Sequence, residues 1–328
     1  MNMRLRWPFP SQPTTTACAL FLLAVLAPLS EATAQQAFTY TSAKQRQAHN
    51  LYLLAEGGDQ QSIDALRQAA NAGDAWSALQ YGYLLDIGAG GMKVDKPAAL
   101  SAYLRAAPGG GASANDGLPI AAYNAGLIYL WGDGATLRTD ITEAIKWLRV
   151  AALSDSGTGG VLPAAMQLAV IYENGFGRQP RNLPESARWY FVAARFGDPV
   201  AMYKKGRILV EGDYVARSPA EGLLMLERAA ERGSQDAKYY LASIYARGTE
   251  YAQQSHYLAC YWLMVAGIHL NGKVRTEYND SIADAMSRLS PGEIKQAQSQ
   301  ATKFIHRYIV RIPNIRYNAP INAPITFY

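Results

Sequence analysis

Apolar residues recur every three or four positions through most of the chain, a spacing that predicts a series of helices with one buried stripe each. Five of these predicted helices share a pattern: a small residue near mid-helix, an aliphatic or aromatic residue three positions later, and a glycine three positions beyond that. The small residues are Gly82, Gly126, Ala169, Gly206 and Ala242. A second apolar-periodic segment follows each pattern, as in "EAIKWLRVAA" and "ESARWYFVAA". No segment sustains the two-residue period of a strand, so the pattern predicts an all-α protein.

The shared pattern returns at intervals of 36 to 44 residues, and each interval contains two predicted helices. Periods of this size indicate an α-solenoid of helix–turn–helix repeats, here with about five copies. The small mid-helix residues let the second helix approach closely, and paired alanines such as Ala151 and Ala152 do the same from the other side. The glycine after each first helix predicts a left-handed C-terminal cap, which a residue with a Cβ atom adopts only with strain.

More polar helices are expected at both ends of the solenoid, because terminal repeats must keep their outer faces soluble. Residues 62–74 predict the second helix of an incomplete copy, and residues 277–308 predict one further helix pair. We therefore expect a solenoid domain with capping helices over residues 35–305. Residues 306–328 are rich in Pro and Asn and predict an extended tail, which is either free or lies along the solenoid.

The N-terminal segment has the features of an export signal. Arg4 and Arg6 precede a 13-residue apolar run, and the small residues "ATA" at 32–34 match a cleavage site. The run is too short to span about 30 Å of hydrocarbon, so we expect a cleaved signal peptide over residues 1–34, no stable membrane insertion and a periplasmic protein. A retained membrane anchor is the alternative. Cys18 lies inside the apolar run and not at its end, so the arrangement of a lipoprotein is absent.

The remaining composition excludes several classes of function. Removal of residues 1–34 takes Arg4, Arg6 and Glu31 from a chain of formal net charge +5 and leaves +4. The basic residues are scattered, whereas a nucleic-acid-binding protein should show a basic stripe, so we expect no nucleic-acid partner. Cys260 is then the one remaining cysteine and lies in an apolar segment, where a buried, inert thiol is favoured over a reactive one.

No pattern in the sequence predicts catalysis, a metal site or a cofactor. The four histidines have no spacing typical of metal ligands, and the motifs of nucleophilic elbows, phosphate-binding loops and zinc proteases are missing. Three carboxylates, Asp86, Glu173 and Glu211, fall near the ends of successive first helices. Such residues should form a row along the solenoid and not the facing pair that a glycosidase needs, so we expect solvated helix ends and no catalytic residues.

The repeated line "A…(G/A)x(I/L)(Y/L)xxG…A…W…AA" resembles the Sel-one-like repeat (SLR) family, a relative of the tetratricopeptide repeats. The resemblance covers roughly residues 62–267. Two copies depart from the pattern by carrying the Gly-rich loops "PGGGASANDG" and "DSGTGG", and two lack the tryptophan found at Trp147, Trp189 and Trp262. The resemblance implies an α-solenoid that binds other proteins.

In the related tetratricopeptide repeats, first-helix side chains that point away from the second helices line a concave surface. By that analogy, the positions three before and one, four and five after the small residue form the predicted partner-binding surface. Its residues are Tyr83, Asp86, Tyr123, Leu127, Trp131, Met166, Glu173, Asn174, Tyr203, Arg207, Glu211, Tyr239 and Arg247. Tyr, Trp, Met and Arg are enriched at protein interfaces. The alternative is that about half of the aromatic residues pack between repeats as core.

The favoured hypothesis is a non-enzymatic, periplasmic protein-binding module. The resemblance allows two versions of it. In one, the protein is an immunity protein that blocks a secreted antibacterial toxin, such as a lipase delivered by a type VI secretion apparatus. In the other, it is a scaffold for cell-envelope or exopolysaccharide assembly. Such scaffolds are often lipid-anchored, and a lipid anchor needs a cysteine at the end of the apolar run. Because this chain has none there, the immunity version is favoured. An envelope enzyme with a helical-repeat body is the competing class.

Overall fold

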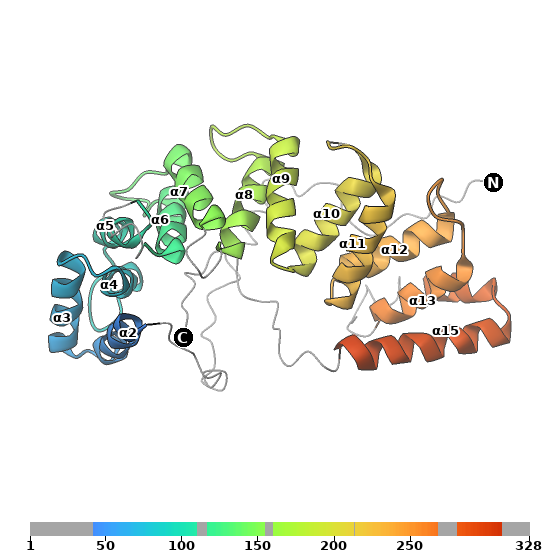
Figure 1. Ribbon diagram of the computed structural model, residues 1–328, viewed down its shortest axis with the longest axis horizontal. Coiled ribbons are helices and arrows are strands. Elements are labelled where there is room, and N and C mark those ends of the chain that lie inside the picture. Colours follow the sequence, from blue (N-terminus) through green and yellow to red (C-terminus); the bar gives the residue numbers. More distant parts are fainter. Residues whose placement is uncertain (1–41, 110–116, 155–159, 213, 268–280, 310–328) are drawn as a thin grey trace. The chain divides into compact units, whose positions relative to one another are not determined.

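The structure, a computed structural model, describes residues 42–109, 117–154, 160–212, 214–267 and 281–309 (Figure 1). In these residues the chain is helical and contains no strand; isolated bridges join Phe176 to Gln179 and Thr249 to Ala252 in two loops. The predicted all-α class is confirmed. The expected signal peptide (residues 1–34) and residues 310–328 of the expected tail lie outside the described residues.

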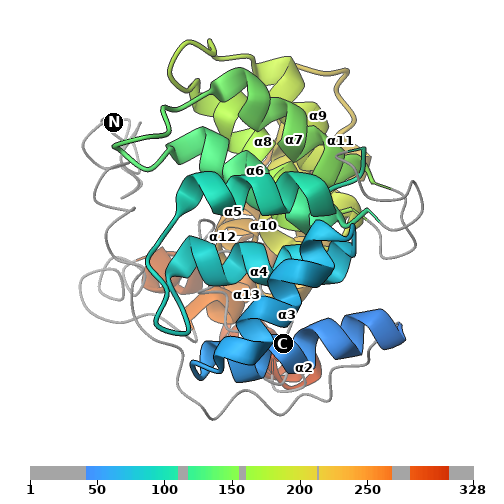
Figure 2. The ribbon, with the colours of Figure 1, turned by 90° about the vertical axis from the view of Figure 1, so that its left-hand side faces the viewer.

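The described residues form two compact units, here called the first unit (residues 42–192) and the second unit (residues 193–309). In the first unit, α4 packs on α5 and α6 on α7, while α3 contacts α4, α5 contacts α6 and α7 contacts α8. The loops from α4 to α5 and from α6 to α7 lie on the same side of this unit, at the left of Figure 2. Its helices are α2 (Ala43–Glu56), α3 (Gln60–Asn71), α4 (Ala75–Ile87), α5 (Lys96–Ala106), α6 (Pro119–Trp131), α7 (Ile141–Leu153), α8 (Leu162–Asn174) and most of α9 (Leu183–Arg195).

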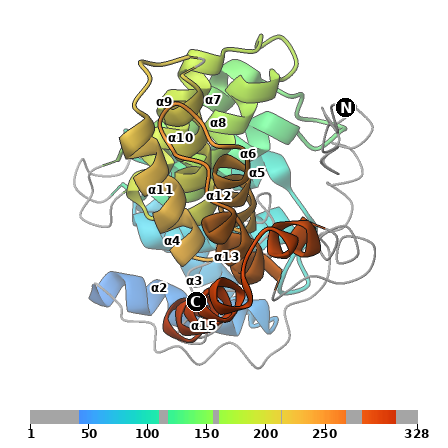
Figure 3. The same ribbon diagram turned by 90° about the vertical axis from the view of Figure 1, so that its right-hand side faces the viewer.

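The second unit repeats the same pairing (Figure 3). Helix α10 packs on α11 and α12 on α13, α11 contacts α12, and α15 covers α13. Residues 281–287 are also helical. The last described segment, η3, continues the helical chain through Ile309, so the expected start of an extended tail at residue 306 lies inside a helical segment. The helices are α10 (Pro199–Glu211), α11 (Pro219–Glu231), α12 (Gln235–Arg247), α13 (His256–Ala266), α15 (Pro291–Phe304) and η3 (Ile305–Ile309).

Side-chain caps fix where many of these helices begin. The carboxylates of Asp74, Asp95, Asp140 and Asp198 accept hydrogen bonds from backbone N–H groups in the first turns of α4, α5, α7 and α10. These bonds satisfy donors that the helix itself leaves unpaired. At the helix ends, the predicted left-handed cap is confirmed for Gly88 and Gly212, with φ of 70° and 73°. The prediction is wrong for the other three terminal glycines, Gly132, Gly175 and Gly248. Their φ is positive, but their ψ is extended, so they do not adopt the left-handed helical conformation.

The small mid-helix residues bring the two helices of a repeat into close contact, as predicted. A Cβ atom at Gly126 would lie 2.9 Å from Cγ of Leu148, and one at Gly206 would lie 2.9 Å from the backbone oxygen of Gly222. Alanines of the second helices, such as Ala151 and Ala229, have no exposed surface. Cys260 is fully buried in α13, as predicted, and burial raises the pKa of its thiol.

Candidate partner-binding surface

Two acidic residues of the predicted surface face the second helix of their own repeat. Asp86 is buried and accepts hydrogen bonds from Lys96 and from the Tyr103 hydroxyl of α5, at 3.2 Å for Tyr103. Glu173 accepts a 2.5 Å hydrogen bond from the Tyr190 hydroxyl of α9. Four residues advance a helix by about 400°, so these positions lie only about 40° from the small residue that contacts the second helix. The expectation that they point away from the second helix is therefore wrong.

Other predicted residues of the first unit pack between helices. Tyr123 has no exposed surface and Leu127 keeps 7%, because α6 is buried on nearly all sides. Tyr83 is half-buried, and its ring lies 5.7 Å from that of Tyr52 in α2. These three side chains fill the space between neighbouring helices and offer little surface to a partner.

The part of the predicted surface that remains exposed in the first unit lies near the ends of α6 and α8. Trp131 keeps 36% of its surface exposed, and its indole stands edge-on to the ring of Phe176 at 5.3 Å. Asn174 is exposed and donates to the backbone oxygen of Val170, while Met166 is half-buried. Phe176 was not predicted, because it follows the terminal glycine of α8 and lies outside the helical pattern.

In the second unit, four side chains of α10 and α12 form a connected cluster, here called the α10–α12 cluster: Tyr203, Arg207, Glu211 and Tyr240. The Arg207 guanidinium lies 3.3 Å from a carboxylate oxygen of Glu211, whose other oxygen accepts a 3.0 Å hydrogen bond from the Tyr240 hydroxyl. The rings of Tyr203 and Tyr240 meet edge-on at 6.1 Å. The structure thus brings together three predicted residues of one repeat and one tyrosine of the next repeat that was not predicted.

The cluster combines two phenols of raised pKa with an ion pair that is partly accessible to solvent. Burial and then the charge of Glu211 raise the pKa of Tyr240, and burial likewise raises the pKa of Tyr203, so both phenols stay neutral near neutral pH. The charged pair remains in contact with solvent, with side-chain exposures of 36% for Arg207 and 33% for Glu211. Tyr240 was not among the predicted residues because it lies two positions before Ala242, whereas the analogy selects the positions three before and one, four and five after the small residue. Tyrosine itself is typical of interfaces.

The last two predicted residues flank this cluster on α12. Tyr239 is half-buried and packs against the core of the second unit. Arg247 is exposed, and its guanidinium donates to the hydroxyl and the backbone oxygen of Ser243. Arg247 therefore supplies a solvent-facing cation near the end of α12.

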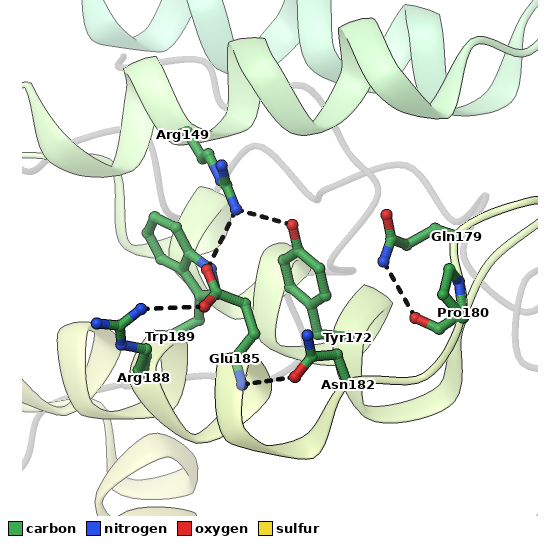
Figure 4. A network of polar contacts seen from close by, with 8 residues as sticks. All are labelled: Arg149, Tyr172, Gln179, Pro180, Asn182, Glu185, Arg188 and Trp189. Atoms are coloured by element: carbon green, nitrogen blue, oxygen red, sulfur yellow. Dashed lines mark hydrogen bonds and ion pairs between the residues drawn. The ribbon is translucent and has the colours of Figure 1, made fainter.

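A separate polar network connects α7 to α8 and α9 in the first unit (Figure 4). Arg149 donates to the Tyr172 hydroxyl at 2.9 Å and to Glu185 at 3.1 Å, and its guanidinium lies 6.0 Å from the ring centre of Trp189. Glu185 also accepts from the indole of Trp189, four residues along the same helix. A Glu and a Trp at the same spacing, Glu143 and Trp147, form the equivalent bond in α7, so this pairing was visible in the sequence.

The arrangement of these residues suits the recognition of a macromolecule. Among the described residues, no three His, Cys, Asp or Glu side chains are grouped so that they could hold a metal ion. None of the described helices combines the length and the apolar composition needed to cross a membrane. The α10–α12 cluster offers two aromatic rings beside a guanidinium and a carboxylate, which are joined by an ion pair and by a hydrogen bond from Tyr240.

A family model for the Sel1 repeat matches residues 77–107, 119–156, 162–198, 199–234 and 235–263, which together are more than half of the chain. These matches coincide with the five predicted copies, and Sel1 repeats generally mediate protein–protein interaction. No curated protein matches the chain.

Solved structures of similar fold include a Sel1 repeat protein from Oxalobacter formigenes, with 23% identity over 79% of this chain and 99% of that protein and a TM-score of 0.58. A protective antigen of uropathogenic Escherichia coli with an SLR fold shares 19% identity over 81% of this chain, with a TM-score of 0.42. This chain spans 61% of the antigen's length. The immunity protein Pa5087 from Pseudomonas aeruginosa shares 16% identity over 73% of this chain and 83% of its own, with a TM-score of 0.29.

Proposed function

The chain belongs to the Sel1 repeat family, and from this premise we propose that it is an exported, non-enzymatic module that binds another protein through the α10–α12 cluster. The observation that carries the proposal is the joining of Tyr203, Arg207 and Tyr240 from two successive repeats around one carboxylate, Glu211. Tyr and Arg side chains supply a large share of binding energy in protein interfaces. Arg207 and Tyr240 already contact Glu211 through an ion pair and a hydrogen bond, so they lose less conformational entropy when a partner binds than free side chains do.

The proposed site of action is the periplasm, reached through the signal peptide at residues 1–34, with Gln35 as the first residue of the mature protein. The basic start, the short apolar run and the "ATA" sequence support this. N-terminal sequencing of the exported protein is expected to begin at or near Gln35, and the protein is expected in the periplasmic fraction. A membrane-bound protein that still begins with Met1 contradicts this part of the proposal.

For the biological role, we propose an immunity protein that neutralises a secreted antibacterial toxin. The position of Cys18 inside the apolar run, and not at its end, supports a protein without the lipid anchor that envelope scaffolds often carry. Capture of partners from periplasmic extract with the mature protein tests this role directly. A toxin among the captured proteins supports it, whereas a component of envelope or exopolysaccharide assembly places the protein among scaffolds.

The binding surface is tested with the variant Tyr203→Ala/Arg207→Ala, assayed against the captured partner. We expect the affinity to fall by about 2 kcal/mol, roughly 30-fold, because both residues lie in the proposed contact. The matched control is Tyr172→Ala/Arg149→Ala, which removes the same two residue types from the network of Figure 4 and is expected to keep its affinity. Melting followed by circular dichroism checks the fold of both variants. If the first variant melts lower but binds as tightly as the wild type, these side chains are inter-repeat core and the proposal is wrong.

A further inference from the structure

Two successive repeats of the first unit carry the same group of a tyrosine, a glutamate and a tryptophan. In α7 the indole of Trp147 donates a hydrogen bond to Glu143 at 3.0 Å. In α9 the indole of Trp189 donates one to Glu185 at 3.2 Å. In both repeats the tyrosine stands three positions after the small residue of the first helix. We call the two groups the α6–α7 set (Tyr129, Glu143 and Trp147) and the α8–α9 set (Tyr172, Glu185 and Trp189).

The tyrosines of the two sets occupy equivalent places near the ends of α6 and α8. The backbone oxygen of Tyr172 accepts a 2.7 Å hydrogen bond from the N–H of Asn182, just before α9. The backbone oxygen of Tyr129 accepts one of the same length from Asp140, just before α7. Burial, followed by the charge of Glu143, raises the pKa of Tyr129, as expected for a phenol near that carboxylate. Both repeats therefore hold the tyrosine in the same position relative to the second helix.

In the α8–α9 set, an arginine of the preceding repeat binds all three residues (Figure 4). Arg149 of α7 donates to the Tyr172 hydroxyl at 2.9 Å and to Glu185 at 3.1 Å. Its guanidinium lies 5.9 Å from the ring centre of Tyr172 and 6.0 Å from that of Trp189. Glu185 also accepts a 3.3 Å hydrogen bond from Arg188, so its carboxylate serves two guanidinium groups. The chain itself thus shows how such a set binds a guanidinium.

The α6–α7 set has a leucine in place of this arginine. Ala106 of α5 and Ala151 of α7 occupy equivalent positions, because their backbone oxygens accept hydrogen bonds, of 2.8 and 2.9 Å, from the residues just before α6 and α8. Two positions before these alanines stand Leu104 and Arg149. An aliphatic side chain neither donates a hydrogen bond nor pairs with a carboxylate. The preceding repeat therefore supplies no guanidinium to the α6–α7 set.

The α6–α7 set is also the more exposed of the two. Tyr129 is half-buried, whereas Tyr172 keeps only 5% of its surface exposed. The side chain of Glu143 is 33% exposed, compared with 21% for Glu185. The surface that Arg149 contacts in one repeat is thus more accessible to solvent in the other.

The lysine beside Glu143 corresponds to Arg188 and not to Arg149. Lys146 pairs with Glu143 at 2.9 Å from three residues along the same helix, as Arg188 pairs with its own glutamate. The ammonium group lies 5.1 Å from the ring centre of Trp147, and the lysine side chain is 57% exposed. Because the glutamate of the α8–α9 set accepts from two cations at once, the pair with Lys146 leaves Glu143 able to accept from a second one.

We propose that the α6–α7 set is a second contact site of this protein and that it receives an arginine side chain of a partner protein, in the way that the α8–α9 set receives Arg149. A guanidinium can donate to a carboxylate and to a phenol together while it lies against aromatic rings. The site adds a contact to the proposed protein-binding role. None of its residues belongs to the α10–α12 cluster, so the two surfaces are tested separately.

The probe is N-acetyl-arginine amide, titrated into the mature protein and followed by the NMR signals of the tryptophan indole N–H groups. The control ligand is N-acetyl-citrulline amide, which has nearly the same shape but no charge. We expect the arginine compound to bind about tenfold more tightly, because only its hydrogen bonds to the carboxylate are charge-assisted on both sides. The largest shift is expected for the signal of Trp147, assigned with Trp147→Phe. Absent binding, equal binding of the two compounds, or a larger shift of another tryptophan overturns the proposal.

Replacement of the leucine tests the site from inside the chain. Leu104→Arg is expected to place a guanidinium on the α6–α7 set and to weaken probe binding about tenfold, because the new side chain competes for the same groups. The matched control is Leu104→Met, an uncharged side chain of similar size, which is expected to bind the probe as the wild type does. Unchanged binding by Leu104→Arg contradicts the proposal.

The reverse replacement should create the same site in the next repeat. In Arg149→Leu, the arginine compound is expected to shift the indole signal of Trp189 as well as that of Trp147. A signal of Trp189 that does not respond shows that such a set does not bind a free guanidinium, and the proposal is then wrong.

Three further variants identify the groups responsible. Glu143→Gln is expected to weaken probe binding about tenfold, because the carboxylate charge is lost. Lys146→Gln is expected to keep its affinity; a tenfold gain shows that the lysine itself takes the place of the guanidinium, which overturns the proposal. Tyr203→Ala/Arg207→Ala, which alters the α10–α12 cluster, is expected to bind the probe normally. A loss of probe binding in this variant shows that the probe binds at that cluster and not at the α6–α7 set.

Discussion

At the scale of single residues, the close approach of helices α10 and α11 depends on the absence of a Cβ atom at the glycines where they meet. A Cβ atom at Gly206 of α10 would lie 2.9 Å from the backbone oxygen of Gly222, and one at Gly222 of α11 would lie 2.8 Å from that of Gly206. The two backbones therefore touch at this point. A backbone oxygen cannot rotate away as a side chain can, so a methyl group here must push the helices apart.

Gly206→Ala is accordingly expected to destabilise the second unit by about 1–3 kcal/mol, because overpacking at a helix contact forces the backbone to shift. Denaturant unfolding followed by circular dichroism measures the change. The control is Gly292→Ala in α15, where a Cβ atom meets nothing within 4 Å; we expect its stability to change by less than about 1 kcal/mol. A Gly206→Ala protein as stable as the wild type shows that α10 and α11 adjust without cost.

Lys238 is a second residue whose position has a measurable consequence. Its side chain in α12 is only 1% exposed, and its ammonium group donates a hydrogen bond to Gln235 at 2.9 Å. Burial lowers the pKa of this group to about 8. The unfolded chain has a lysine pKa of about 10.4, so the unfolded state binds more protons between pH 8 and 10.4, and this lysine destabilises the fold most below pH 8.

Lys238→Met is therefore expected to raise the free energy of unfolding at pH 7 by up to about 3 kcal/mol, since a methionine of similar length carries no charge to desolvate. The gain should shrink as the pH rises from 8 to 10.4, where the wild-type amine loses its proton in both states. Urea unfolding at pH 7 and pH 10 measures it, with Lys205→Met, which breaks an ion pair with Glu221, as the control. A gain that does not change with pH argues against a buried charge at this position.

At the scale of helices, the sequence was sufficient to locate all five helix pairs, because each carries the helical period, a small contact residue and a terminal glycine. It was less informative about which way each side chain faces. Glu173 contacts the second helix of its repeat, whereas Asn174, one position further on, is exposed, because one residue rotates a helix by about 100°. Burial of Tyr123 depends on how closely the helices around α6 approach it, which no local pattern encodes. Tyr240 and Phe176 join the surface through contacts between repeats, so their role appears only in three dimensions.

The contact between successive repeats around Arg149 is another feature that only the folded chain shows, and it has a measurable strength. The ion pair between Arg149 of α7 and Glu185 of α9 is partly exposed, with side-chain exposures of 45% and 21%. We expect a double-mutant cycle with Arg149→Met and Glu185→Gln to give a coupling of about 0.5–1 kcal/mol. The control cycle uses Arg67 and Asp64, a more exposed pair within α3, and should give about 0.3 kcal/mol. Equal couplings show that the contact between repeats adds nothing to an ordinary surface pair.

At the scale of the whole chain, each compact unit has its own core. Residues of α2, α3 and α4, among them Tyr52, Leu66 and Leu84, form a buried cluster in the first unit. A larger cluster in the second unit runs from Met202 of α10 to Phe304 of α15. Within each unit, a helix contacts mainly the helices next to it in the sequence. Stability in such a solenoid is approximately a sum of the stabilities of single repeats and of the contacts between neighbours.

This organisation predicts how the effect of one substitution spreads. Gly126→Ala places a methyl group 2.9 Å from Cγ of Leu148 and is expected to loosen the contact of α6 with α7. Hydrogen exchange followed by mass spectrometry should then accelerate most in α6 and α7, less in α5 and α8, and least in α2 and α3, because local opening precedes unfolding of the unit. In the second unit, Gly206→Ala should show the same gradient from α10 and α11 toward α15. If exchange accelerates equally throughout a unit, the nearest-neighbour account is wrong and the repeats of that unit unfold together. In that case, a partner bound at one repeat stabilises all repeats of the unit.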